Sequence, residues 1–229
     1  MNPFISVVIP LYNGIEFLNE ALSSVLEQTF TDWELLIGVN GHGPDGGDVF
    51  KQAVSLVDSK GSSKIRVINY PSAKGGAETL NLLAADSKSD WIAFLDVDDK
   101  WHPMKLLAQV HKILNLKPEA DIIGTNCSYF GRMSGSPAVF TNGYVDISVF
   151  KNYNPMINSA VVMRKSLVDF KGILYDYDLW CRLILQNKIF YNIPSFLTFH
   201  RVHDGSYYNT TGIQDPEAIK RTYFPSDQG

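Results

Sequence analysis

The stretch that decides the fold is Trp91-Ile92-Ala93-Phe94-Leu95-Asp96-Val97-Asp98-Asp99. An almost wholly apolar run ends there in three carboxylates within four residues. The run suits a central strand covered by helices on both faces, and its C-terminal end is where open α/β sheets bind ligands. Without a cation, three such carboxylates would repel each other and at least one pKa would rise. One interpretation is therefore a site for Mg²⁺ or Mn²⁺, which prefer hard oxygen ligands, and the other is a solvated acidic turn before a helix.

The residues before this stretch alternate between strand and helix patterns. Strands are expected at residues 5–9, 33–39 and 65–68, the first of them stopped by Pro10. Helices are expected after the capping-box pair Asn13 and Glu16, after the Gly-rich turn 41–47, and over residues 76–85. Crossovers of this length join parallel strands, so residues 1–100 predict a nucleotide-binding α/β half.

The second half of the chain has a less regular pattern. We expect residues 101–210 to form a smaller mixed region and residues 211–229 to form a polar tail in which disorder is an option. The predicted helices are 103–116 and one that begins near Asp176, and residues 130–143 are predicted to be a loop or hairpin. The predicted strands are 121–125, 158–164, 190–193 and 196–202.

Composition sets limits on the class of protein. With 229 residues, 45% of them hydrophobic, the chain can form one large α/β domain. The net charge of −4 argues against non-specific nucleic-acid binding. Cys127 and Cys181 are too few for a disulfide framework. Because no signal peptide or long apolar run is evident, we expect a cytoplasmic protein, with peripheral association at the inner face of the membrane left open.

Two motifs are literal matches in the wrong context. Residues 41–46 read G-x-G-x-x-G, but the dinucleotide fingerprint follows the first strand of its unit, and Pro44 removes an amide that would face the pyrophosphate. Asp96-Val97-Asp98 is similar to the motif of phosphatases with an aspartyl nucleophile. That motif, however, follows a first strand and needs Thr or Val where Lys100 stands. Both assignments are set aside.

Four segments in order resemble the family 2 glycosyltransferases, which are inverting sugar-nucleotide enzymes of the GT-A fold. They are residues 6–13, residues 94–99, Asp176-Tyr177-Asp178-Leu179-Trp180 and Arg201-Val202-His203. The resemblance covers roughly residues 4–208. It implies a GT-A type α/β fold, with one nucleotide-binding half around a mostly parallel sheet and a smaller mixed acceptor-binding region. It also implies a nucleoside-diphosphate sugar as donor, most simply a UDP-sugar, and Mn²⁺ or Mg²⁺ as cofactor.

The resemblance also assigns roles to individual residues. Asp176 matches the catalytic base. The metal ligands implied are Asp98, Asp99 and His203. The residues matched to the nucleotide are Pro10, Tyr12, Asn13, Asn40, Lys74, Gly75, Asp96, Val97 and Asp98. Those placed at the acceptor are Tyr175, Asp178, Trp180 and Arg201.

Several of these residues also have a structural interpretation. Asp176 could be the N-cap of its helix, and Asn13 the cap of the first helix. Trp180 lies between Leu179 and Leu183 on an apolar helix, which favours a core position. A lone His203 would be unremarkable; Arg201 and Asp204 beside it favour a metal or phosphate role.

The chain departs from the family pattern in two places. The second strand usually ends in Asp-Asp-Gly-Ser, whereas this chain has Val39-Asn40-Gly41-His42, so only Asn40 could accept from a uracil imide. The residue before the base is usually Glu and here is Tyr175. The predicted function is transfer of a sugar to a hydroxyl of a saccharide or lipid-linked acceptor in cell-surface polysaccharide synthesis. The alternatives are a catalytically weak sugar-nucleotide-binding partner subunit and a nucleotidyltransferase.

Overall fold

The first half of the chain is the predicted alternation of strands and helices. The computed structural model describes residues 2–137, 141–172, 174–205 and 215–225. In chain order the elements are β1 (Ile5–Leu11), α1 (Leu18–Leu26), β2 (Trp33–Asn40), α2 (Gly47–Lys60), β3 (Ile65–Tyr70), α3 (Gly76–Asp86) and β4 (Trp91–Phe94). The four strands are parallel in the order β3-β2-β1-β4, which confirms that they form a sheet of the nucleotide-binding type.

The second half extends the same sheet with mixed pairing. Its elements are β5 (Lys100–Trp101), α4 (Lys105–Asn115), β6 (Ile122–Gly131), β7 (Gly143–Tyr144), α5 (Ile147–Phe150), η1 (Asn158–Ala160), β8 (Val162–Arg164), η2 (Lys165–Leu167), α6 (Tyr175–Leu185), β9 (Phe190–Val202) and α8 (Pro216–Tyr223). The order continues from β4 through β8, β6 and β9 to β5. Strands β8 and β5 are antiparallel to their neighbours, whereas β6 and β9 are parallel to each other.

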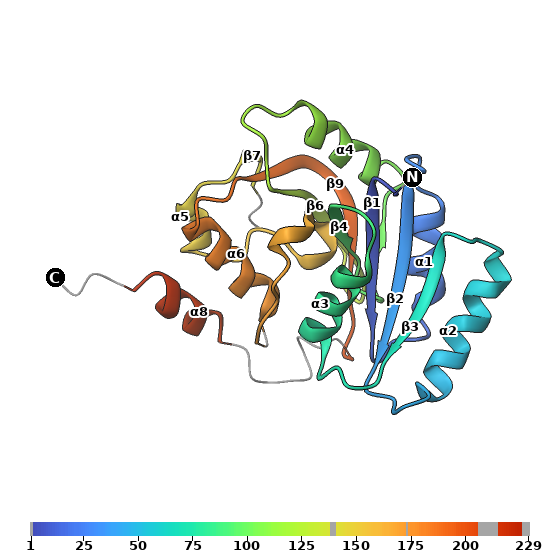
Figure 1. Cartoon of the computed structure of the whole chain (residues 1–229). Helices are drawn as coiled ribbons and strands as arrows, with labels where there is room; N and C mark the ends of the chain where they lie inside the picture. Colours follow the sequence, from blue (N-terminus) through green and yellow to red (C-terminus); the bar gives the residue numbers. More distant parts are fainter. Residues whose placement is uncertain (1, 138–140, 173, 206–214, 226–229) are drawn as a thin grey trace.

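Helices cover both faces of the sheet (Figure 1). Successive strand residues point to opposite faces, so Val7 and Ile9 join a core cluster with α1, α2 and α4, while Val8 joins one with α3, α5 and α6. All residues of β2 are buried. This two-sided burial explains the near-continuous apolar runs in the sequence.

Two local predictions in the first half are wrong. Strand β1 continues through Pro10 to Leu11, because the pairing of β1 with β4 ends at Val8 and Pro10 pairs with β2 alone. Asn13 and Glu16 do not start helix α1, which begins at Leu18. A turn comes first, in which Gly14 has φ +88° and its carbonyl accepts from the amide of Phe17.

Two strand predictions in the second half also change. The predicted strands 190–193 and 196–202 are one strand, β9, whose register with β6 shifts between Ile193 and Phe196. Pro194 lies in that shift, where its missing N–H costs no ladder hydrogen bond. The predicted strand 158–164 begins only at Val162, after the 3-10 turn η1.

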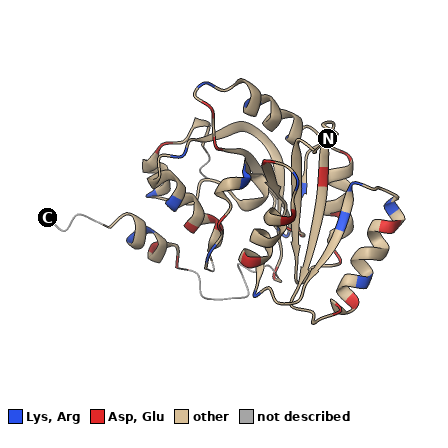
Figure 2. Cartoon of the chain, in the orientation of Figure 1, with Lys and Arg blue, Asp and Glu red and all other residues tan. Residues whose placement is uncertain are grey.

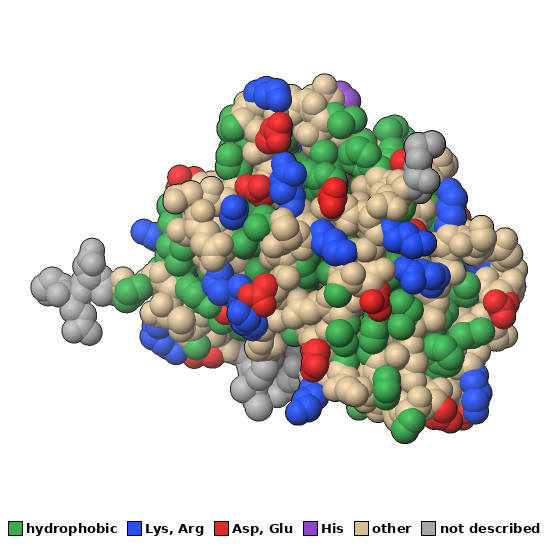
Figure 3. Space-filling view, in the orientation of Figure 1, with side chains coloured by type: hydrophobic (Ala, Val, Ile, Leu, Met, Phe, Trp, Pro, Cys, Tyr) green, Lys and Arg blue, Asp and Glu red, His purple; other side chains and the backbone are tan. Residues whose placement is uncertain are grey.

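The surface carries mixed charges. Figure 2 shows Lys and Arg interspersed with Asp and Glu on helices and loops, and the face in Figure 3 mixes charged and hydrophobic side chains. In the predicted tail, residues 216–223 form helix α8, which contacts α6. Among the described residues, no helix has the length and apolar character needed to cross a bilayer.

Candidate active site

The loops after β1, β2 and β4 meet at the C-terminal edge of the sheet. A Cβ atom on Gly41, after β2, would lie 2.6 Å from the ring of Tyr12, so Tyr12 packs directly on this glycine. A Cβ on Gly14 would lie 3.0 Å from Cγ1 of Val97. The structure therefore brings together the predicted nucleotide residues that follow these three strands.

Asn40 ends β2 and is 2% exposed. Its Oδ1 is buried and has no hydrogen-bond partner among the described residues. Beside it, Tyr12 is 54% exposed, and its ring lies 5.4 Å from the ring of His42, whose Nε2 donates to the Tyr12 carbonyl over 2.5 Å. Asn40 therefore ends β2 with a covered acceptor oxygen beside the exposed ring of Tyr12, at the edge where the predicted nucleotide residues lie.

Asp96 begins a tight turn that η1 holds in place. The Asp96 amide donates to Ser159 Oγ over 3.0 Å, and Asn158 Nδ2 donates to Asp96 Oδ1 over 3.0 Å. Burial, followed by the charges of Asp99 and Asp98, raises the pKa of Asp96 to about 7. The predicted repulsion among the carboxylates is therefore present in the fold.

Asp98 faces His203 from the end of β9. His203 Nε2 lies 2.9 Å from Asp98 Oδ2, and the His203 ring contacts Phe17 with centroids 5.0 Å apart. Burial and then the charge of Asp99 raise the pKa of Asp98, against the opposing hydrogen bond from His203. Two predicted metal ligands thus meet at a carboxylate whose ionised form is disfavoured by burial and by the nearby charge of Asp99.

Asp99, predicted to be the third metal ligand, points elsewhere. It is 1% exposed, accepts from the Arg201 amide over 2.8 Å, and lies 3.1 Å from His200 Nδ1 through both oxygens. Burial lowers the pKa of His200, but the hydrogen bond and charge of Asp99 outweigh this and raise it to about 9. In the described ranges, no three His, Cys, Asp or Glu side chains gather in a metal-binding arrangement. Asp98 and His203 thus face each other, whereas the Asp99 carboxylate contacts His200 and the Arg201 amide, and the set of three ligands stays a prediction.

Asp176 lies in the first turn of α6, after the N-cap residue Leu174, so the capping interpretation is wrong. Asn154 Nδ2 donates to its Oδ2 over 3.0 Å, and the Tyr177 amide donates to its Oδ1 over 2.7 Å. Burial raises its pKa, whereas these hydrogen bonds and the charge of His200 act in the opposite direction. Asp176 is therefore within electrostatic reach of the Asp99–His200 pair.

The loop before α3 approaches α6. A Cβ on Gly76 would lie 3.5 Å from the ring of Tyr175, which places Lys74 and Gly75 near the start of α6. The Lys74 amide donates to Glu78 Oε2 over 2.8 Å, and Gly75 has φ +111°, a conformation that favours glycine. Tyr175 thus lies beside the loop that carries Lys74 and Gly75, and the roles of these three residues stay predictions.

Three residues predicted to lie at the acceptor make contacts within the fold, and their role at the acceptor stays a prediction. Trp180 is fully buried and donates from Nε1 to the Met156 carbonyl over 3.1 Å, so its core interpretation is confirmed. Asp178 accepts from Arg182 Nε over 2.8 Å and from the Tyr223 hydroxyl over 2.6 Å, which ties α6 to α8. The Arg201 guanidinium lies between the rings of Phe17 and Phe130.

Sequence reasoning missed the residues that support these carboxylates. They include Asn154 against Asp176, and Asn158 and Ser159 against Asp96. The available signal is the polar pair Asn158-Ser159, which precedes an apolar run in the segment 158–164 that the sequence predicts as a strand. Asn154 lies in a loop and had no such signal.

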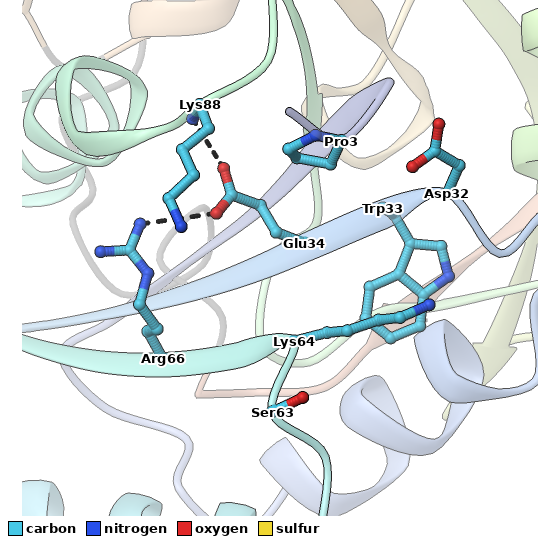
Figure 4. Close-up of a pocket in the computed structure, with 8 residues that line it drawn as sticks. All are labelled: Pro3, Asp32, Trp33, Glu34, Ser63, Lys64, Arg66 and Lys88. Carbon is cyan, nitrogen blue, oxygen red and sulfur yellow. Dashed lines mark hydrogen bonds and ion pairs between the residues drawn. The ribbon is translucent and has the colours of Figure 1, made fainter. Parts of the chain in front are cut away.

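A hollow at the other end of the sheet belongs to the scaffold (Figure 4). Here Glu34, at the N-terminal end of β2, accepts from Ser6 Oγ over 2.7 Å and from the Lys88 amide over 2.6 Å, and pairs with Arg66 at 3.5 Å. The carboxylate is thereby satisfied by three neighbouring segments. This hollow holds none of the predicted site residues.

A family model described as glycosyl transferase family 2 matches residues 6–165, which cover β1 to β8 and the acidic turn. The chain belongs to glycosyl transferase family 2. An uncharacterised glycosyltransferase of Rickettsia typhi is 27% identical over 95% of this chain and 70% of its own length. WfgD of Escherichia coli, a UDP-Glc:α-D-GlcNAc-diphosphoundecaprenol β-1,3-glucosyltransferase, is 28% identical over 81% of this chain and 71% of its own.

Solved structures show the same fold. TarS of S. aureus (residues 1–349), in complex with UDP-GlcNAc, superposes with a TM-score of 0.72 at 15% identity, covering 92% of this chain. The mannosyltransferase PcManGT of Pyrobaculum calidifontis, in complex with GDP-Man and Mn²⁺, gives 0.67 at 14% identity and 91% coverage. This chain spans 61% of that TarS chain and 59% of the PcManGT chain. The protein has the GT-A fold that the sequence predicted.

Proposed function

We propose that the protein is an inverting glycosyltransferase that moves a sugar from a UDP-sugar to a hydroxyl of a saccharide or lipid-linked acceptor, in cell-surface polysaccharide synthesis. The observation that carries the proposal is the arrangement of Asp96, the Asp98–His203 pair and Asp176 around one edge of the sheet. Family membership supports the reaction class. The UDP-glucose donor and diphosphoundecaprenol-linked acceptor in the name of WfgD support the choice of substrates.

The donor's nucleotide would lie across the ends of β1, β2 and β4. The buried Oδ1 of Asn40 would accept from the imide N–H of uracil, and Tyr12 would contact the base. Asp96, held by Asn158, would accept from the ribose hydroxyls. Lys74 and Gly75 would border the nucleotide from the start of α3.

Asp98 and His203 fit a divalent cation of the Mg²⁺ or Mn²⁺ kind. A carboxylate and an imidazole face each other at 2.9 Å, and the nearby Asp99 carboxylate adds negative charge that a cation would offset. Such ions commonly take one or two protein ligands and fill the other positions with substrate phosphate oxygens and water. The bound ion would offset negative charge on the departing diphosphate as a Lewis acid. The presence of Mn²⁺ with PcManGT supports this assignment.

Asp176 would act as the general base. Its carboxylate removes the proton of the acceptor hydroxyl while that oxygen attacks the anomeric carbon and the bond from this carbon to the diphosphate oxygen breaks. Asn154 and the Tyr177 amide fix the orientation of the carboxylate. One displacement with one base and no protein nucleophile inverts the configuration.

The replacement Asp176→Asn tests this role. We expect UDP binding with Mn²⁺ to survive while donor hydrolysis and transfer fall by about 10²–10⁴-fold, the usual contribution of a general base. The control is Asp48→Asn on α2, whose side chain is 87% exposed and lies 3.6 Å from the ammonium of Lys51. Binding without turnover in the wild-type protein, across a broad panel of donors and acceptors, would instead indicate a sugar-nucleotide-binding partner subunit.

A further inference from the structure

Arg201 on β9 is a partly buried arginine whose side chain contacts two aromatic rings, a carboxylate and a backbone carbonyl. Its guanidinium carbon lies 4.3 Å from the centroid of Phe130 and 4.6 Å from that of Phe17. Its side chain is 16% exposed and forms an ion pair with Glu20 of α1. The planar cation is therefore held by two aromatic rings and one carboxylate.

The same side chain also contacts the acidic turn. Arg201 Nε donates to the Asp98 carbonyl over 2.9 Å, and the Arg201 amide donates to Asp99 Oδ1 over 2.8 Å. These contacts join the acidic turn to β9. One of them is made to the backbone of Asp98, whose side chain faces His203. Arg201 is thus attached to the turn but does not compete for the Asp98 carboxylate.

Glu20 anchors the guanidinium from helix α1. It accepts from Lys100 Nζ over 2.5 Å as well as from Arg201. The hydrogen bond from Lys100, with that from Arg201 and both charges, outweighs burial and lowers the pKa of Glu20, so the carboxylate stays ionised. One acidic residue on α1 therefore holds cations from both β5 and β9.

Phe17 links this cluster to His203. The ring that stacks on Arg201 also contacts the imidazole of His203, with centroids 5.0 Å apart. Arg201 thus contacts the backbone of Asp98, and Phe17 contacts His203, which follows Val202, the last residue of β9. The relative position of these two side chains depends on the arginine and its aromatic neighbours.

We propose that Arg201, seated between Phe17 and Phe130 and held by Glu20, is a positioning residue that sets the separation of Asp98 and His203 and thereby the affinity of this pair for a divalent cation. The inference rests on the proposed function, because it concerns the cation that function uses. Arginine suits the role because its planar fork can stack on two rings and donate along two directions at once. A lysine would keep the charge but lose both properties.

The test replaces Arg201 by lysine and titrates Mn²⁺ into the UDP-bound protein, with free Mn²⁺ measured by electron paramagnetic resonance. We expect Arg201→Lys to weaken Mn²⁺ binding by about 10- to 100-fold, the usual effect of losing a partner that orients a metal ligand. UDP binding without Mn²⁺ should be unchanged. Glu20→Gln, at a residue whose side chain is 44% exposed, should weaken Mn²⁺ binding in the same direction and less strongly.

The matched control is Arg182→Lys. Arg182 is 18% exposed and pairs with Asp178 and Asp169, so its replacement should lower the melting temperature without changing Mn²⁺ affinity. Unchanged Mn²⁺ affinity in Arg201→Lys, with wild-type turnover that depends on Mn²⁺, would overturn the positioning role alone. A wild-type protein that binds no Mn²⁺ with UDP would overturn both this role and the proposed metal site.

Discussion

At the scale of single residues, Asn40 stands at the end of β2, where the resemblance to family 2 glycosyltransferases leads us to expect a carboxylate. Its amide oxygen is buried without a hydrogen-bond partner among the described residues. A buried acceptor left unpaired costs about 1–3 kcal/mol. The apo protein therefore bears a cost that a ligand donating an N–H at this point would remove.

Replacing Asn40 by aspartate should increase the affinity for UDP and lower the stability of the protein without ligand. A hydrogen bond to a carboxylate is roughly twice as strong as one between neutral groups, so we expect UDP to bind about tenfold more tightly. The same charge is buried without a partner in the apo protein, so the melting temperature should fall. Calorimetry with UDP and thermal unfolding measure the two effects.

The control for this variant is CDP, which lacks the imide N–H and should not gain affinity. Equal affinity of the variant for every nucleoside diphosphate, unchanged from wild type, would place the base elsewhere.

The three carboxylates after β4 show that a motif predicts where side chains lie but not which contacts each of them makes. Asp96, Asp98 and Asp99 all stand in the acidic turn that the sequence identified as the functional end of β4, and that location is confirmed. The contacts that distinguish them come from β9, about a hundred residues later in the chain. There His200 and the Arg201 amide contact the Asp99 carboxylate. Nothing local to the turn distinguishes Asp98 from Asp99.

At the scale of elements, the first half was predictable because its information is local. Each strand is a continuous apolar run and each helix has an apolar face, so position along the chain determines the element. The turn η1 and the long β9 depend on pairing with distant strands. Pro194 predicts a break between two strands. In the structure it lies at the register shift between β6 and β9, where it pairs with no residue of β6.

Helix α4 carries a buried lysine that sequence reasoning did not identify. Lys105 is fully buried, donates from Nζ to Gln109 Oε1 over 2.9 Å, and lies 4.0 Å from the centroid of the Trp101 ring. Burial lowers its pKa well below the usual value. The folded protein therefore binds fewer protons at this position than the unfolded chain does.

The replacement Lys105→Met should change how stability depends on pH. Because the unfolded chain holds the extra proton, this lysine makes the wild-type free energy of unfolding rise with pH until its ordinary pKa near 10.5 is passed. We expect urea denaturation to show that the free energy of unfolding of the wild type, relative to that of Lys105→Met, rises from neutral to alkaline pH. The rise should be at most about 1.4 kcal/mol per pH unit. The variant should be the more stable protein at neutral pH.

Lys112→Met on the same helix is the control, since Lys112 is only partly buried, with its ammonium 5.1 Å from the ring of Tyr191. Parallel pH curves for the wild type and Lys105→Met would show that the lysine is protonated in the folded state.

At the scale of the whole molecule, UDP with Mn²⁺ should stabilise the fold. A ligand that binds only the native state adds about 2.7 kcal/mol at a hundred times its dissociation constant, which raises the melting temperature by several degrees for a domain of this size. A thermal-shift panel of nucleoside diphosphates measures this. We expect UDP to exceed the others, and Mn²⁺ to increase its effect in wild type but not in Asp98→Ala.

The sheet order determines when, during folding, the contact between Asp98 and His203 can form. The Asp98–His203 contact closes a loop of 105 residues, and the Arg201–Glu20 contact closes one of 181. Contacts this distant form late in folding, because the entropy of closing the loop is lost before the contact repays it. During synthesis the βα half can therefore fold while its acidic turn lacks support, and β9, the last strand in the described part of the chain, then brings His203 to Asp98. Under the proposed function, a nascent chain that lacks β9 should not bind Mn²⁺ at this pair.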